Sequence, residues 1–210
     1  MILIVFKVTG CGTSQMANRI PGQSLHLFGP LGKGFPALPV NRKVILASGG
    51  VGLPPLYFMA KKSIQNGSPI ANLTFIAGGK SADDILERTG LLELGIEASI
   101  CTDDGSLGFK GNVVDLLARH LTENPECTVY ACGPAPMLRG VDSLLVSRGI
   151  PGFLSLETLM PCGYGICSGC AVKVNPPAEL GPTDDNRNYH LKRVCIDGPV
   201  FDAGEVIWPE

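Results

Sequence analysis

Short apolar runs alternate with longer segments of helical spacing through the middle of the chain. The apolar runs cover residues 44–48, 73–78, 97–102, 128–133 and 152–157. The segments with helical spacing cover residues 53–65, 82–94, 112–123 and 135–149. Such alternation predicts parallel strands that are buried on both faces by helices. Because crossovers are right-handed, residues 44–157 are expected to form a five-stranded, doubly wound parallel sheet.

The two ends of the chain have a different pattern. Residues 1–43 contain short apolar stretches between Gly and Pro turns, which favours part of an antiparallel β-barrel. Residues 158–210 are rich in Cys and Gly and contain a polar stretch, 175–190, that is expected to be a surface loop. The predicted class is therefore α/β, with a partial antiparallel barrel, a parallel sheet and a small Cys-rich module.

The composition excludes some classes of partner. Hydrophobic residues make up 45% of the chain, charged residues 17%, and the net charge is −2 without a run of Lys or Arg. This argues against a nucleic-acid partner. Residues 44–60 carry no charge, but glycines and prolines interrupt them, and no export signal precedes them, so neither a membrane span nor secretion is expected. A cytoplasmic location follows, in which the eight cysteines are reduced thiols.

Four cysteines have the spacing of an iron–sulfur site. Cys162, Cys167 and Cys170 follow the pattern C-x4-C-x2-C, and Cys195 comes 24 residues after Cys170. This spacing is typical of a plant-type [2Fe–2S] cluster. The glycines between them let the loop fold tightly and turn its amides toward the sulfur atoms. A structural zinc site with four cysteine ligands remains the alternative, although zinc ligands usually occur as two C-x2-C pairs.

A glycine-rich turn joins the first predicted strand of the sheet to its helix. Gly49, Gly50 and Gly52 stand there, followed by Pro54. Glycines in this place allow a pyrophosphate to approach the backbone at a helix N-terminus. The second strand ends in Gly78-Gly79-Lys80-Ser81, without the acidic residue of the standard dinucleotide fingerprint. A turn needed only for packing is therefore the competing interpretation.

Taken together, four segments resemble a known family. They are SGGVGLPPLYFMA (48–60), YACGPAPMLRGV (130–141), SLETLMPCGYGICSGCAVKV (155–174) and KRVCIDGPVFDAGEV (192–206). Their order resembles the ferredoxin–NAD(P)+ reductase superfamily, and the last two are similar to the electron-transfer subunit of B-type dihydroorotate dehydrogenase. The resemblance implies FAD, a [2Fe–2S] cluster and NAD(H) as cofactors, and a catalytic flavoprotein subunit as partner, in a heterotetramer.

The resemblance also implies roles for single residues. The pyrophosphate loop of the nicotinamide dinucleotide would comprise Gly49, Gly50, Gly52 and Pro54, and the turn beside the nicotinamide Cys132, Gly133 and Pro134. Contacts to FAD would come from Val5, Phe6, Lys7, Gly12 and Thr13. The cluster ligands would be Cys162, Cys167, Cys170 and Cys195. No side chain is implied as a catalytic acid, base or nucleophile, because the cofactors carry the reaction.

The first part of the chain departs from the family pattern. The Arg-Pro-x-Ser motif of the flavin barrel is absent, and 43 residues precede the strand at Val44, whereas a six-stranded barrel needs roughly 50–60. An incomplete barrel, or an N-terminally truncated chain, is expected, with an incomplete FAD site.

Two further functional hypotheses stay open. One is the related subunit of an NADH-dependent ferredoxin–NADP+ oxidoreductase or of a sulfide dehydrogenase. The other is a non-enzymatic zinc-binding interaction module on a nucleotide-binding scaffold.

Overall fold

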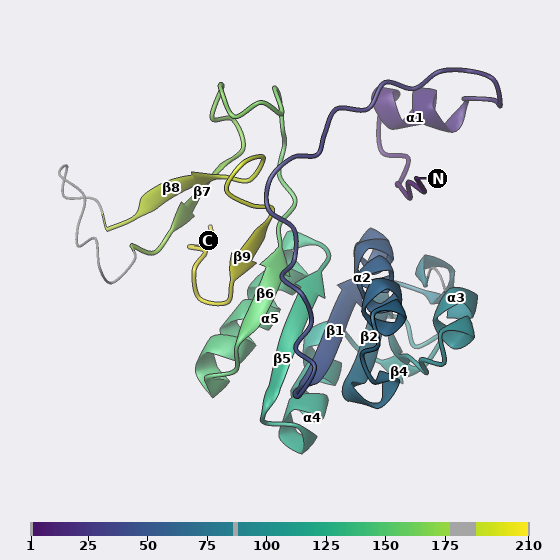
Figure 1. The fold of residues 1–210 in the computed structure, drawn as a ribbon, viewed down its shortest axis with the longest axis vertical. Coiled ribbons are helices and arrows are strands. Elements are labelled where there is room, and N and C mark those ends of the chain that lie inside the picture. The colour runs from purple at the N-terminus through teal and green to yellow at the C-terminus, as the bar shows by residue number, and fades with distance from the viewer. Residues whose placement is uncertain (1, 86–87, 177–187, 210) are drawn as a thin grey trace.

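The structure of the chain, a computed structural model, describes residues 2–85, 88–176 and 188–209. Its centre is a seven-stranded sheet in the order β4-β3-β2-β1-β5-β6-β9 (Figure 1). All neighbouring strands are parallel except β6 and β9, which are antiparallel. The strands are β1 (Lys43–Gly49), β2 (Leu73–Gly79), β3 (Ser99–Thr102), β4 (Phe109–Lys110), β5 (Cys127–Cys132), β6 (Gly152–Ser155) and β9 (Val200–Asp202).

Helices cover both faces of this sheet. They are α2 (Leu53–Gln65), α3 (Arg88–Glu93), α4 (Val113–Glu123) and α5 (Ala135–Arg148). Alternate residues of β1 divide between the two faces: Val44 and Leu46 pack with α2 and α3, whereas Ile45 and Ala47 pack with α4 and α5. This is the period of two that a strand requires. The prediction of a doubly wound sheet with helices on both faces is confirmed.

Three details of the fold differ from the expectation. The short strand β4 pairs with β3, and β9 from the C-terminal part adds an antiparallel edge strand. The helix expected over 82–94 is present as a 3₁₀ turn, Ala82–Asp84, and the short α3. Two further 3₁₀ turns cover Gly50–Gly52 and Ile70–Asn72.

The antiparallel barrel expected for residues 1–43 is not formed by residues 2–42. Their one regular element is α1 (Cys11–Ala17), and their one β-bridge joins Lys33 to Pro199. Figure 1 shows α1 and the N-terminus set apart from the sheet. An apolar strand is stable only when neighbouring strands pair with it, and the structure provides none for this segment. Many of its apolar side chains are accordingly exposed, as Leu3, Leu27 and Phe28 illustrate, although Leu38 near its end is buried in the core.

The Cys-rich part forms a small two-stranded antiparallel sheet. Its strands are β7 (Ala171–Val174) and β8 (His190–Arg193), and Figure 1 places this sheet beside the β6–β9 edge of the main sheet. Most of the surface loop expected at 175–190 lies outside the described residues. Among the described residues, no helix is long and apolar enough to cross a membrane.

Candidate functional site

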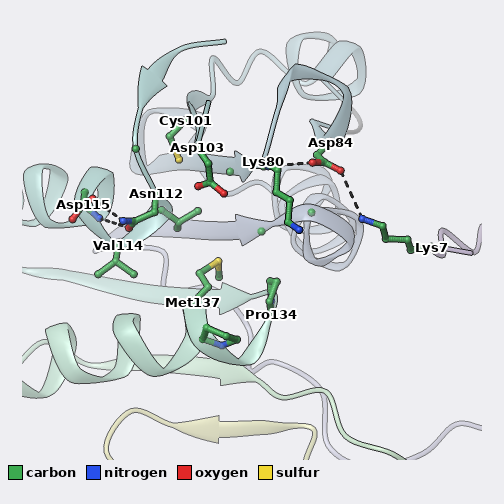
Figure 2. Close-up of a pocket in the computed structure, with 17 residues that line it drawn as sticks. Lys7, Lys80, Asp84, Cys101, Asp103, Asn112, Val114, Asp115, Pro134 and Met137 are labelled. Carbon is green, nitrogen blue, oxygen red and sulfur yellow. Dashed lines mark hydrogen bonds and ion pairs between the residues drawn. The ribbon is translucent and has the colours of Figure 1, made fainter. Parts of the chain in front are cut away.

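A cavity of about 620 Å³ opens at the carboxyl ends of the parallel strands (Figure 2). Gly49 and Gly79 line it at the ends of β1 and β2, Cys101 lines it from β3, and Pro134 follows β5. The chain proceeds from β1 toward β4 on one side and continues to β5 and β6 on the other. Open α/β sheets bind their ligands at such a reversal of strand order. The volume lies in the range of small-molecule and cofactor sites.

The glycine-rich turn forms one wall of this cavity. Gly50 has a φ of 51°, and a Cβ built on it would meet no atom within 4 Å, so its backbone faces open space. A Cβ on Gly52 would lie 2.1 Å from the carbonyl oxygen of Cys132, and one on Gly49 would lie 2.6 Å from Sδ of Met137. The turn therefore packs directly on the Cys132–Pro134 turn. Both the packing role and the nucleotide role of these glycines fit the structure.

The expected nucleotide residues lie together, but at different depths. Gly49, Gly50 and Pro134 line the cavity. Gly52 and Gly133 lie behind this surface, in the contact between the two turns. Pro54 is in the first turn of α2, where its missing N–H removes no helical hydrogen bond.

Cys132 is a neutral thiol at physiological pH. Burial raises the pKa of Cys132 to about 11; a hydrogen bond with Ser155 lowers it, and the charge of Glu157 raises it. Cys132 and Ser155 are register partners at the ends of β5 and β6. The Cys132 thiol is therefore a small uncharged group beside the cavity and is not poised to act as a nucleophile.

Two charged side chains of the cavity, Asp84 and Asp103, were not identified from the sequence, whereas Lys7 and Lys80 were. Nζ of Lys7 lies 3.9 Å from Oδ1 of Asp84, and Oδ2 of Asp84 accepts a hydrogen bond from the backbone N–H of Lys80 (Figure 2). Within the described ranges, neither the Lys80 ammonium group nor the Asp103 carboxylate has an ion-pair partner. The dinucleotide fingerprint places an acidic residue after the second strand. Here Asp103 follows the third strand instead, one residue beyond β3. A search of every strand end would have found Asp103.

The expected FAD residues are only partly assembled. Lys7 reaches the cavity, and Val5 and Phe6 are half-buried. The hydroxyl of Thr13 accepts hydrogen bonds from the N–H groups of Thr9 and Gly10, so its acceptor capacity serves the start of α1, which also contains Gly12. The described residues of this segment thus fit only part of a flavin site, namely the cation at Lys7.

The four expected cluster cysteines come from two loops. Cys162, Cys167 and Cys170 lie between β6 and β7, and Cys195 follows β8. The sulfur atoms of Cys170 and Cys195 are 3.3 Å apart, and both residues are buried. Cys162 and Cys167 interact through a hydrogen bond between their side chains. The thiols therefore form two pairs.

Backbone amides of the loop stabilise negative sulfur. Hydrogen bonds from the Cys167 amide, the Cys167 thiol and the amides of Tyr164 and Ile166 lower the pKa of Cys162 to about 6. The Cys195 amide lowers the pKa of Cys170, whereas the hydrogen bond to Cys170 raises the pKa of Cys195. Each pair thus holds one thiol that ionises readily, and metals bind cysteine as the thiolate.

This donor set fits a two-iron cluster. Four cysteines ligate a [2Fe–2S] cluster, and Cys162, Cys167, Cys170 and Cys195 would hold one here. Two thiol pairs supply that number. Among the described residues, no three His, Cys, Asp or Glu side chains converge as ligands of a single ion.

The N-terminal segment also contacts the cluster loop. The rings of Phe28 and Tyr164 have their centroids 4.3 Å apart, and the backbone of Lys33 bonds to that of Gly198. Arg193 donates a hydrogen bond to the carbonyl oxygen of Gly165 and pairs with Asp197. The hydrogen bond from Arg193 to Gly165 joins the two loops that carry the cysteines, and the N-terminal segment contacts both loops.

Family models match most of the chain. The iron–sulfur cluster binding domain of dihydroorotate dehydrogenase B matches residues 157–207, and the oxidoreductase NAD-binding domain matches residues 46–143.

Two similar curated proteins carry the same description, electron transfer subunit of dihydroorotate dehydrogenase B (NAD(+)). The one from Desulforamulus reducens is 34% identical over 99% of this chain and 75% of its own length. The one from Geobacillus thermodenitrificans is 37% identical over 98% of this chain and 74% of its own length.

Solved structures agree on the fold. An NADH-dependent reduced ferredoxin–NADP oxidoreductase superposes with a TM-score of 0.77 at 28% identity, over 97% of this chain and 67% of the other. The cytochrome b5 reductase domain of Ulva prolifera nitrate reductase superposes with a TM-score of 0.51 at 19% identity, over 67% and 61%. The latter supports the fold alone.

The contact between the two turns predicts the effect of a methyl group at Gly52. Gly52→Ala places Cβ against the Cys132 carbonyl and must separate the turns. We expect the affinity for NADH to fall about tenfold or more, because the displaced turn would lose at least one close contact with the dinucleotide. Titration calorimetry would measure it. Gly34→Ala, where a Cβ meets no atom, is the control. Unchanged affinity in Gly52→Ala would show that the turn does not bind the dinucleotide.

The pairing of thiols predicts which cysteines hold metal. After anaerobic purification we expect about two irons and two sulfides per chain. Serine at position 162, 167, 170 or 195 should abolish the visible absorption of the cluster, whereas Cys127→Ser, a buried thiol away from both loops, should keep it. One zinc per chain without colour would contradict the assignment.

Proposed function

The chain belongs to the family of electron transfer subunits of dihydroorotate dehydrogenase B, and from this membership we propose that it carries electrons between NAD(H) and a catalytic flavoprotein that acts on dihydroorotate, in pyrimidine biosynthesis. It is thus an oxidoreductase subunit, with NAD(H), FAD and a [2Fe–2S] cluster as its cofactors. A cytoplasmic location is part of the proposal, because reduced thiols persist there.

One observation carries the proposal. Strands β5 and β6 end side by side, with Cys132 opposite Ser155. Strand β5 leads into the turn that borders the cavity. Strand β6 leads to Cys162 of the cluster loop, seven residues after Ser155. A dinucleotide in the cavity and a cluster on the four thiols would thus occupy adjoining parts of one sheet edge.

Residues of the chain would bind and orient these groups. Gly49 and Gly50 allow the pyrophosphate to approach, and Lys80 supplies a cation at the same cavity. Asp103 has a carboxylate available for a ribose hydroxyl. When bound, the flavin exchanges electron pairs with the nicotinamide and single electrons with the cluster.

The solved NADH-dependent ferredoxin–NADP oxidoreductase supports a second candidate in the same class. The two candidates differ in the nucleotide. The Asp103 carboxylate, which has no ion-pair partner among the described residues, would repel a 2′-phosphate, while Lys80 would attract one.

We expect the cluster of the purified protein to be reduced by NADH about tenfold or more faster than by NADPH, a discrimination that one carboxylate can provide. Stopped-flow bleaching of the visible absorption measures both rates. Asp103→Asn should lower the ratio of the NADH rate to the NADPH rate. Asp104→Asn is the matched control, because the Asp104 carboxylate accepts a hydrogen bond from Ser106 and does not line the cavity. Equal rates in the unmodified chain would favour the second candidate.

A family named as a subunit implies a catalytic partner. We place its docking surface on the cluster loop, because large apolar side chains are exposed there. They are Leu159, Met160, Tyr164, Ile166 and Ile196, with Leu159 81% and Ile166 84% exposed. Contiguous exposed apolar surface marks interaction sites, and electron transfer requires the cluster to approach the acceptor. Two copies of each subunit, a heterotetramer, complete the proposal.

Ile166→Asp tests this surface. A charge at the centre of an apolar interface should weaken association with the dihydroorotate-oxidising subunit about tenfold or more. Size-exclusion chromatography with light scattering gives both the affinity trend and the stoichiometry. Leu92→Asp, at an exposed position on α3, is the control. If Ile166→Asp binds the partner as the unmodified chain does, the docking surface lies elsewhere.

A further inference from the structure

One buried carboxylate has no role in the cofactor sites described above. Asp142 lies on α5 and is 5% exposed, the one charged residue among the buried polar side chains of the described residues. Its two oxygens accept hydrogen bonds from the backbone N–H of Gly204, at 2.7 Å, and from Nε1 of Trp208, at 2.6 Å. No cation in the described part of the chain pairs with it. A buried carboxylate with only neutral donors is costly to desolvate, so it must keep its hydrogen bonds. These bonds fix the direction of the contact, which an apolar side chain would not do.

A third hydrogen bond, from the same face of α5, reaches the same segment. Arg139 is one helical turn before Asp142, and its Nη1 donates a hydrogen bond to the carbonyl oxygen of Pro209 at 3.1 Å. Three hydrogen bonds thus connect side chains of α5 to residues 204–209. We call residues 204–209 the C-terminal segment.

The other side of the C-terminal segment is bonded to the cluster module. The N–H of Asn175 donates to the carbonyl of Glu205 at 2.8 Å, and the N–H of Ile207 donates to Lys173 of β7 at 2.9 Å. Lys192 of β8 forms an ion pair with Glu205. The C-terminal segment therefore lies between α5 of the nucleotide-binding part and the small sheet of the cluster module.

Packing alone does not fix this junction. A cavity of about 570 Å³ lies between the first turn of α5, β7 and the C-terminal segment. Pro136 lines both this cavity and the nucleotide cavity, so the first turn of α5 separates the two. Val206 extends the apolar core into the junction, but apolar contact has no preferred direction. The bonds to Asp142 supply that direction.

We propose that Asp142 is a positioning residue for electron transfer: it holds the C-terminal segment, and through it the cluster module, in a fixed place against the helix that starts at the nicotinamide turn. The effect on electron transfer rests on the proposed function, whereas the positioning of the cluster module by Asp142 involves only residues of this chain. Electron transfer depends steeply on distance, so a shift of the module would slow it without removing either cofactor.

Asp142→Asn tests the proposal with little change of shape. An amide has one acceptor oxygen and would set its NH₂ group against one of the two N–H donors. Loss of a hydrogen bond to a charged group should accelerate amide exchange about tenfold or more at Gly204 and also at Asn175 and Ile207, which bond the cluster module. Trp208 is the only tryptophan of the chain, so its emission should shift to the red as the indole gains water.

The rate at which NADH reduces the cluster should fall about fivefold or more, with iron content and NADH affinity unchanged. Trp208→Phe, which removes one donor, should reproduce the slower reduction and the faster exchange. Glu123→Gln, an exposed carboxylate-to-amide change on α4, should alter none of these quantities.

Three results overturn the proposal: exchange as in the unmodified chain, faster exchange confined to Gly204, or faster exchange throughout the junction with an unchanged rate of cluster reduction. If NADH fails to reduce the cluster in the unmodified chain loaded with FAD, the proposed function is wrong, and exchange at Asn175 and Ile207 alone decides whether Asp142 positions the module.

Discussion

The parallel pairing of β5 with β6 is the constraint on which the rest of the structure depends. Parallel strands end at the same edge of a sheet, so the turn after β5 and the loop after β6 leave from neighbouring points. One borders the nucleotide cavity and the other carries three of the four cysteines proposed as cluster ligands. A hydrogen-bonded register, rather than any contact between cofactors, therefore brings the two sites together.

Local backbone geometry then gives each site its chemistry. At the cavity, the absence of a Cβ on Gly52 lets the glycine-rich turn lie on the Cys132 carbonyl. At the cluster loop, Gly163, Gly165 and Ser168 adopt positive φ, and amides of this loop turn toward Cys162. The same kind of thiol is consequently neutral in the buried place at Cys132 and readily ionised at Cys162. At Cys132 burial outweighs the one hydrogen bond with Ser155 and raises the pKa, whereas at Cys162 several amide donors lower it.

Features with local causes could be predicted from the sequence. The strands and helices of 44–157 follow from hydrophobic period and length. The cysteine spacing likewise places Cys162, Cys167 and Cys170 on one loop, and their role as ligands stays a prediction. Features that depend on distant partners could not. The stretch 24–29 alternates like a strand, yet no strand in the described part of the chain pairs with it, and it stays exposed. Asp103 gained its place at the cavity from the order of strands, and the bond from Trp208 to Asp142 spans 66 positions.

X-ray absorption at the iron and zinc edges of the anaerobically isolated protein tests the central claim most directly, namely that the four thiols hold a two-iron cluster beside the nucleotide cavity. The account predicts absorption at the iron edge, with a first shell of sulfur only and a second iron atom as the next neighbour. A zinc edge with four sulfur neighbours and no iron would contradict it.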